Sequence, residues 1–400
     1  MPLSLKRLFL CPSSGTQIRK EIFMKTINGV YTSAKIFNTN TTEYSIDDYA
    51  IAQLQALCDN EAFDGCKIRV MPDVHPGKVG TIGFTSTLGK RILPNVLGID
   101  IGCGMTLAKV KGKTKEFQKL DVVIRDKVPS GFAIRKSAHH MADAADLSRL
   151  ICYKHIFEEK ACLSLGTLGG GNHFIELGTD DENLTYLTVH TGSRHLGKKV
   201  TEYYLSEGQK YLKKKGITIP YETTYLEGEL MESYLHDLNI VQEFAALNRD
   251  IIIAEIAKGM KWKVLDSYSC IHNYVDFGSD TPILRKGAIS AGKGERVIIP
   301  INMRDGILLG TGLGNSDWNN SAPHGAGRIM KREAVKDSYT VSAFKSAMKG
   351  IYSSCIGKET LDEAPFAYRD IASIKEAIAD TVSVDKVIKP IYNFKAGSSF

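Results

Sequence analysis

The sequence lacks the features that mark membrane proteins and secreted proteins. None of its apolar runs approaches the roughly 18 residues that a membrane-spanning helix needs. Near the start, the apolar patch at residues 8–11 is too short for the core of a signal peptide. The eight cysteines form no C-x-x-C pair, and eight in 400 residues is far below the density of a secreted disulfide scaffold. We therefore predict a soluble protein of the reducing cytoplasm that makes no membrane contact.

Length and composition set only broad limits. With 43% hydrophobic and 24% charged residues, the chain is ordinary for a globular protein that can bury a sizeable core. A net charge of +6 at pH 7 is compatible with an anionic substrate but does not by itself indicate nucleic acid. Because low-complexity linkers, internal repeats and breaks in composition are missing, we predict one domain over residues 1–400.

Short apolar runs bounded by glycine and proline predict buried strands. These runs are residues 68–70, 79–84, 96–101, 107–110, 187–189, 297–301 and 307–309. Helices are predicted over 47–58, with Ser45 as the N-cap, and over 231–260, where apolar residues recur every three to four positions. A third helix should end at the lysine run 213–215, before Gly216. The pattern predicts mixed α and β structure in which strands lead into glycine-rich loops, where binding groups tend to lie.

Residues 98–105 contain a carboxylate, Asp100, three positions before a thiol, Cys103. Glycines beside both side chains allow tight bends and close approach to a metal or a phosphate. A buried aspartate is costly unless it is paired or coordinates a metal. The structural alternative is a turn after a strand, with a cysteine in the core.

Four of the ten histidines lie in similar settings, flanked by glycine, asparagine or a following arginine: His173, His190, His272 and His324. One aspartate, one cysteine and three histidines are enough to hold two metal ions if the thiolate bridges them. Ligating cysteine must be deprotonated and ligating histidine neutral. Thiolate and imidazole suit zinc, whereas manganese prefers oxygen ligands, so ligand softness alone suggests zinc. The spacing of the residues does not settle which metal binds.

Phosphate oxygens could be bound at two glycine-rich segments. Asn172 follows the glycines at 169–171, and residues 325–328 combine backbone amides with a guanidinium. The chain has no G-x-x-x-x-G-K-[ST] loop, and residues 310–314 are not part of a G-x-G-x-x-G motif because position 315 is asparagine. These patterns argue against a P-loop or Rossmann nucleotide site.

Five motifs, in the same order, resemble those of the RtcB family of RNA ligases, the 3′-phosphate ligases used in tRNA splicing and RNA repair. They are residues 71–77 (MPDVHPG), 98–105 (GIDIGCGM), 166–176 (GTLGGGNHFIE), 190–194 (HTGSR) and 324–328 (HGAGR). Residues 365–371 (PFAYRDI) resemble a late family segment, with Arg369 in place of the usual lysine. The resemblance implies an α+β fold, a single compact domain in which mixed β-sheets surround a central metal pocket and helices flank it.

The resemblance also implies a role for each site residue. Cys103 would bridge two Mn²⁺ ions, one of them also held by His173 and His190, the other by Asp100 and His272. His324 would be the nucleophile. Contacts to GTP are implied for Asn172, Phe174, Glu176, Asn273, Asn302, Met303, Ala326, Gly327, Tyr368 and Lys395. Contacts to the RNA ends are implied for Arg194, Arg328, Asp73 and His75.

The reaction implied by the resemblance depends on GTP. The histidine would attack the α-phosphate, form a guanylated enzyme and release pyrophosphate. The GMP would move to an RNA 3′-phosphate, and a 5′-hydroxyl would then displace it to join the strands. A 2′,3′-cyclic phosphate end would first be opened to the 3′-phosphate, and archease is a candidate activating partner.

Three departures from the family pattern indicate a divergent branch, for which we expect a role in RNA repair. Residues 301–304 read INMR where the family commonly has Gly-Ser-Met-Gly, and Ile307 occupies a later serine position, so nucleotide contacts on that side are open. Residues 78–83 replace a glycine-aromatic-glycine run, and residues 397–400 extend past the usual family end.

Two other functions use the same residues. A two-metal phosphoesterase or nuclease would use water as its nucleophile. His324 in a glycine-rich loop disfavours this function, because a hydrolase needs no covalent nucleotide carrier. The second is a non-catalytic RNA-end binder, which the intact set of ligand candidates disfavours, since buried polar groups are costly to keep.

Overall fold

The computed structural model describes residues 23–38, 46–278 and 281–396. The apolar patch at 8–11, the predicted cap Ser45 and the segment 397–400 lie outside these residues. In the described part of the chain, no helix combines the length and the apolarity that crossing a bilayer requires. The assignment of residues 1–400 to one domain stays a prediction.

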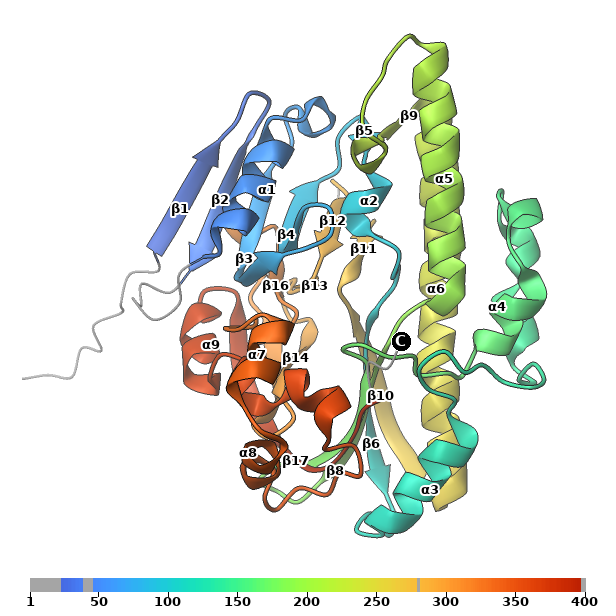
Figure 1. Ribbon diagram of the computed structural model, residues 1–400, viewed down its shortest axis with the longest axis vertical. Coiled ribbons are helices and arrows are strands. Elements are labelled where there is room, and N and C mark those ends of the chain that lie inside the picture. Colours follow the sequence, from blue (N-terminus) through green and yellow to red (C-terminus); the bar gives the residue numbers. More distant parts are fainter. Residues whose placement is uncertain (1–22, 39–45, 279–280, 397–400) are drawn as a thin grey trace, which may run out of the picture.

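The first of two large sheets has six strands, and Asp73 and His75 lie on it. Its order is β1 (Phe23–Asn28), β2 (Ser33–Asn38), β3 (Ile68–Pro76), β4 (Thr81–Thr87), β12 (Ile283–Lys286) and β11 (Asn273–Asp276). β2 and β3 are parallel, and the other neighbours are antiparallel. Helix α1 (Asp48–Cys58) packs against β1, β2, β3 and β4 (Figure 1).

The second sheet has seven strands, all antiparallel to their neighbours. Its order is β10 (Lys263–Ile271), β6 (Gly104–Lys111), β8 (Thr185–Thr191), β7 (Phe174–Thr179), β17 (Val382–Phe394), β15 (Gly306–Gly312) and β14 (Arg296–Asn302). Two small ladders complete the strands: β5 (Arg91–Ile92) with β9 (Leu226–Glu227), and β13 (Ala288–Ser290) with β16 (Ser321–Pro323).

Helices lie around these sheets. The two longest, α5 (Arg194–Lys214) and α6 (Gly228–Met260), run side by side, and α3 (Phe117–Lys127) packs near one end of α6 (Figure 1). The others are α2 (Pro94–Leu97), α4 (Glu158–Ser164), α7 (Arg332–Ser338), α8 (Val341–Ala347) and α9 (Ile371–Ala377). Short 3-10 turns occur at Glu61–Phe63, Ala142–Ala145, Leu147–Arg149, Tyr153–His155, Tyr221–Thr223, Ser316–Trp318, Lys358–Glu363 and Pro365–Ala367.

The apolar patterns explain where these elements pack. On α6, side chains spaced three to four positions apart, such as Leu238, Val241 and Ala245, are fully buried. Further along the chain, Trp318 is buried and stacks on Phe37, with ring centroids 3.9 Å apart. The α+β architecture with several sheets is confirmed, and among the described strands only the six-stranded sheet mixes parallel and antiparallel pairs.

Two details of the sequence prediction are wrong. The run 96–101 is not a strand, because Pro94 starts the short helix α2 and Gly98, at φ 84°, ends it. The cap of α1 is Asp47 rather than Ser45, since the Asp47 carboxylate accepts a hydrogen bond from the amide of Tyr49 at 2.8 Å. The predicted strands at 68–70, 107–110, 187–189, 297–301 and 307–309 fall within β3, β6, β8, β14 and β15, and the one at 79–84 overlaps β4, which begins at Thr81. The predicted helix 231–260 falls within α6, and α5 ends at the lysine run 213–215.

Candidate metal centre and nucleotide pocket

The candidate ligands meet where strands of the two large sheets end. Cys103 immediately precedes β6, and His190 lies near the end of β8, paired in register with Met105. His272 is the single residue between β10 of one sheet and β11 of the other, and its amide donates to the carbonyl of Cys103 at 2.9 Å. The chain therefore passes between the sheets at a candidate ligand.

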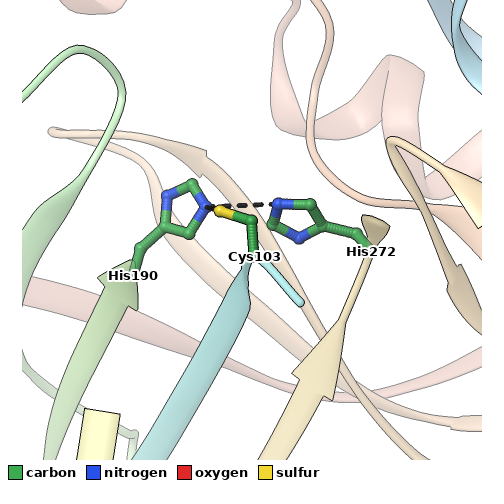
Figure 2. A group of neighbouring side chains, drawn as sticks. All are labelled: Cys103, His190 and His272. Carbon is green, nitrogen blue, oxygen red and sulfur yellow. Dashed lines mark hydrogen bonds between the residues drawn. The ribbon is translucent and has the colours of Figure 1, made fainter. Parts of the chain in front are cut away.

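Cys103, His190 and His272 point toward one another and are buried (Figure 2). The Nε2 atom of His190 lies 3.4 Å from the Cys103 sulfur and 3.3 Å from Nε2 of His272. Neighbouring donors around one four-coordinate ion lie about 3.3–3.8 Å apart when each bond is about 2.0–2.3 Å long. These separations fit a shared divalent cation.

A second group shares the same sulfur. Nε2 of His173 lies 3.5 Å from the Cys103 sulfur and 3.2 Å from Oδ2 of Asp100. Cys103 is thus common to both groups, as a bridging ligand would be. The distances group His190 with His272 and Asp100 with His173, whereas the family resemblance divides the histidines differently. Which side chains share an ion stays a prediction.

Hydrogen bonds fix how two of the imidazoles are oriented. Nδ1 of His173 lies 2.9 Å from the carbonyl oxygen of Leu168, and Nδ1 of His190 lies 3.2 Å from that of Asn172. A carbonyl only accepts, so each Nδ1 carries the proton and each Nε2 directs its lone pair at the cluster. Such converging lone pairs suit a cation.

Burial sets the protonation of the cluster. It lowers the pKa of His190 and His272 well below the usual value, and the charges of neighbouring imidazoles lower them further. Burial also raises the pKa of the Cys103 thiol, and the Asp100 carboxylate raises it further. The Asp100 carboxylate packs against the backbone at Gly192, which is possible because glycine has no Cβ. A Cβ at position 192 would lie 2.1 Å from Oδ1 of Asp100. Neutral imidazoles around one thiol are a donor set that a thiophilic or borderline divalent ion fits.

His324 lies beside this cluster, directly after β16. Its Nδ1 atom donates to Oδ2 of Asp73 at 2.7 Å, and its ring centroid lies 4.9 Å from that of His272. Asp73 is fully buried in β3. Gly327 allows the loop to pass over this aspartate, since it adopts φ 72° and a Cβ there would lie 3.0 Å from the Asp73 Cα. The carboxylate therefore holds the tautomer that leaves Nε2 of His324 unprotonated.

A cavity of about 140 Å³, partly open to solvent, has His324 in its lining. Most of the residues predicted to contact GTP line it: Asn172, Phe174, Glu176, Asn302, Met303, Ala326, Gly327, Tyr368 and Lys395. His75 and Arg328 line it as well. The cavity thus joins a candidate nucleophile to a pocket with aromatic walls and buried charges.

Comparison with known proteins decides the family. The profile of the family described as tRNA-splicing ligase RtcB matches residues 62–396. The chain belongs to the RtcB family. It is 30% identical over 362 residues to the RNA-splicing ligase RtcB of Escherichia coli K12, covering 81% of this chain and 88% of that relative. Over 418 residues it is 25% identical to the tRNA-splicing ligase RtcB of Pyrobaculum aerophilum, covering 80% of this chain and 85% of that protein.

A buried ion cluster in the lining of the RtcB pocket joins two predicted residues, Tyr368 and Lys395, to Glu363 and Arg332, which the sequence prediction missed. Glu363 is 3% exposed, and its Oε2 atom lies 2.8 Å from Nζ of Lys395 and 2.6 Å from the hydroxyl of Tyr368. Its other oxygen pairs with Arg332. Although burial opposes ionisation, the charges of Lys395 and Arg332 lower the pKa of Glu363 to about 2. The acidic side chain therefore holds two cations and an aromatic ring in place.

The altered loop of this RtcB chain lies at the rim of the cavity. Asn302 and Met303 belong to the turn between β14 and β15, where the Asn302 side chain accepts from the amides of Arg304 and Asp305, each at 2.9 Å. Arg304 pairs with Asp305 at 2.8 Å and does not line the cavity. The guanidinium thus stays outside the pocket in this structure.

Of the residues predicted to contact GTP or the RNA ends, three do not line the cavity. The Asn273 side chain braces the ligand loop, donating to the carbonyl of Asp100 at 3.1 Å and accepting from the amide of Gly287 at 3.0 Å. Arg194 donates to the carbonyl of Gly131 at 3.2 Å. Asp73, the third, accepts a hydrogen bond from His324. The roles of Asn273 in GTP binding and of Arg194 and Asp73 in RNA binding stay predictions.

Two further cations near the ligands were also missed. Arg249 is fully buried on α6 and donates to the carbonyl oxygens of Gly102 at 2.8 Å and Thr191 at 3.1 Å, each next to a candidate ligand. Lys286, at the end of β12, is close enough to Asp100 and Cys103 for their charges to oppose the lowering of its pKa by burial. Arg249 and Lys286 are not typical metal ligands and do not lie in a glycine-rich motif. The local sequence therefore gave no sign that they are close to the candidate ligands.

Proposed function

We propose that this protein is an RNA ligase that uses GTP and Mn²⁺ to join RNA 3′-phosphate or 2′,3′-cyclic phosphate ends to 5′-hydroxyl ends. The observation that carries the proposal is the position of His324. Its Nδ1 is held by Asp73 at 2.7 Å, its ring adjoins the candidate metal centre, and it lines the cavity that contains Lys395. A nucleophile, a metal site and a nucleotide pocket are thereby contiguous.

Membership of the RtcB family and the names of the relatives support RNA as the substrate. In the first step, the Nε2 lone pair of His324 forms a bond to the α-phosphorus of GTP. The bond from that phosphorus to the bridging oxygen of the β-phosphate breaks, and pyrophosphate leaves. The Asp73 carboxylate stabilises the positive charge that develops on the ring.

In the later steps, an oxygen of the RNA 3′-phosphate displaces His324 from the GMP phosphorus. The 5′-hydroxyl then attacks the RNA 3′-phosphorus, loses its proton and expels GMP, which closes the phosphodiester. Arg328 faces the same cavity and can pair with phosphate oxygens through its guanidinium. His75 lines the cavity too, and burial lowers its pKa, so it remains a neutral hydrogen-bonding group near the RNA end.

Two divalent cations would be held by Asp100, Cys103, His173, His190 and His272, with the Cys103 sulfur shared. When bound, they would neutralise phosphate charge and orient the attacking and leaving oxygens. Cytoplasmic location, a role in RNA repair and activation by archease are further parts of the proposal.

The test is incubation with GTP labelled at the α-phosphate, in the presence of Mn²⁺, followed by a denaturing gel. Wild-type protein and the exposed-histidine control His155→Ala should carry the label, and His324→Ala should not. Unlabelled wild-type protein that binds manganese would contradict the proposal. RNA cleavage that needs metal and survives His324→Ala would instead favour the phosphoesterase, and RNA binding independent of metal without turnover would favour the end binder.

A further inference from the structure

Two polar side chains face each other across neighbouring strands inside the pocket. Glu176 on β7 is paired in register with Asn393 on β17, so both side chains lie on the same face of the sheet. Both line the cavity, and they are only 3% and 1% exposed. The RtcB resemblance implied a nucleotide contact for Lys395, two residues further along, and none for Asn393.

The pair leaves two acceptors without partners. Nδ2 of Asn393 donates to Oε2 of Glu176 at 2.8 Å. Burial raises the pKa of Glu176 well above its usual value, and the hydrogen bond from Asn393 opposes this shift. An ionised carboxylate only accepts, so with Glu176 ionised the amide nitrogen faces it and the amide oxygen is turned away. Oε1 of Glu176 and Oδ1 of Asn393 have no hydrogen-bond partner among the described residues. Buried acceptors are nearly always satisfied in folded proteins, so this pair is suited to a ligand with adjacent donors.

Guanine has that arrangement of donors, and adenine does not. The N1–H and the 2-amino group of guanine are neighbours on one edge, whereas adenine has an acceptor at N1 and no 2-amino group. An acceptor pair would therefore repel N1 of adenine. Around the pair, the rings of Phe174 and Tyr368 line the cavity, and Nζ of Lys395 is a donor that suits the O6 atom of guanine.

We propose that Asn393 is a specificity-determining residue that reads the 2-amino group of guanine. Its Oδ1 atom accepts a hydrogen bond from that group, while Oε1 of Glu176 accepts from N1–H. The inference rests on the proposed use of GTP and assigns part of the base recognition to a residue for which the resemblance implied no role. A base that lacks the 2-amino group would leave the Asn393 oxygen buried and unpaired. Such a base should therefore bind more weakly than guanine.

Inosine triphosphate, which lacks only the 2-amino group, is the matched probe. We would measure binding of GTP, ITP and ATP by calorimetry without Mn²⁺, for wild type and Asn393→Leu. Wild type should bind GTP about tenfold more tightly than ITP, the effect of one hydrogen bond. Asn393→Leu should lose this preference by weakening GTP binding while leaving ITP binding nearly unchanged. Asn393→Ala provides the same comparison if the leucine variant does not fold.

The outcomes separate this inference from the proposed function. Equal weakening of GTP and ITP binding in the variants would show that Asn393 only supports the fold, and an unchanged ratio would show that it does not read the base. Either result overturns the inference while leaving GTP use intact. If wild type binds neither nucleotide and forms no labelled adduct with GTP and Mn²⁺, the proposed function fails as well.

Discussion

Replacing Asp73 by asparagine should weaken the contact that orients His324 without destabilising the fold. The Asp73 side chain is fully buried, and its Oδ2 accepts from Nδ1 of His324 at 2.7 Å. Its Oδ1 has no hydrogen-bond partner among the described residues. Asparagine has almost the same shape and removes a buried charge, so we expect Asp73→Asn to unfold at the same or a higher temperature than wild type.

The expected kinetic effect follows from the bond that is weakened. A hydrogen bond to a charged group contributes about 1.5–3 kcal/mol, so its loss from the transition state slows guanylation of His324 by about 10- to 150-fold. The amide can also turn its NH₂ group toward Nδ1. That orientation favours the tautomer with the proton on Nε2, which cannot attack phosphorus, and it would increase the loss.

The assay is a single-turnover measurement with saturating labelled GTP and Mn²⁺, together with the GTP dissociation constant measured without metal. Asp73→Asn should form the adduct slowly and bind GTP normally, and the exposed-site variant Asp126→Asn should match wild type in both. A rate for Asp73→Asn within twofold of wild type, or a defect confined to GTP binding, would refute the role of this carboxylate in orienting the nucleophile.

Three further predictions concern the metal centre, the ion cluster and the core. Cys103→Ala should reduce Mn²⁺ affinity by more than about 100-fold in calorimetry, since losing a partner behind a ligand already costs about 10- to 100-fold. Glu363, with its pKa lowered from 4.5 to about 2, stabilises the fold above pH 4.5, and this contribution is lost as the pH falls toward 2. Urea titrations should show Glu363→Gln less stable by about 3 kcal/mol at pH 7, with the difference shrinking below pH 4.5; a constant difference would contradict this. Trp318→Ala should cost about 3–5 kcal/mol of unfolding free energy, because the ring is buried against Phe37.

Local patterns predicted most elements near the site because apolar periodicity and glycine or proline punctuation act over a few residues. The run at 96–101 shows the limit of this reasoning. Its apolar content is typical of a strand, yet Pro94 favours a helix start and Gly98 adopts φ 84°, so the segment becomes a helical turn followed by the ligand loop. The turn residues, rather than the apolar ones, decide the structure there.

The candidate ligands could be predicted because most lie in glycine-flanked motifs and His272 precedes an asparagine, but their partners could not. Asp73 and His324 are 251 positions apart, and only the packing of β3 against the loop after β16 brings them together. Glu363 gave no signal either, since a single glutamate in a charged segment is usually a solvated residue. Its importance depends on burial beside Lys395 and Arg332, which the tertiary structure alone creates.

One part of the nucleotide pocket is formed by a turn and another by two paired strands. We therefore expect the divergent residues of the turn to affect the rate of adduct formation rather than the preference for guanine. At the rim, the turn at Asn302 satisfies its own amides, and Arg304 pairs with Asp305 outside the cavity. At the base end, Glu176 and Asn393 are fixed by the register of two central strands. An Asn302→Ser, Arg304→Gly double variant should therefore change the rate of adduct formation while keeping the wild-type ratio of GTP to ITP affinity. A changed ratio would place base recognition at the rim, because substitutions confined to that turn leave the β7–β17 pair in place.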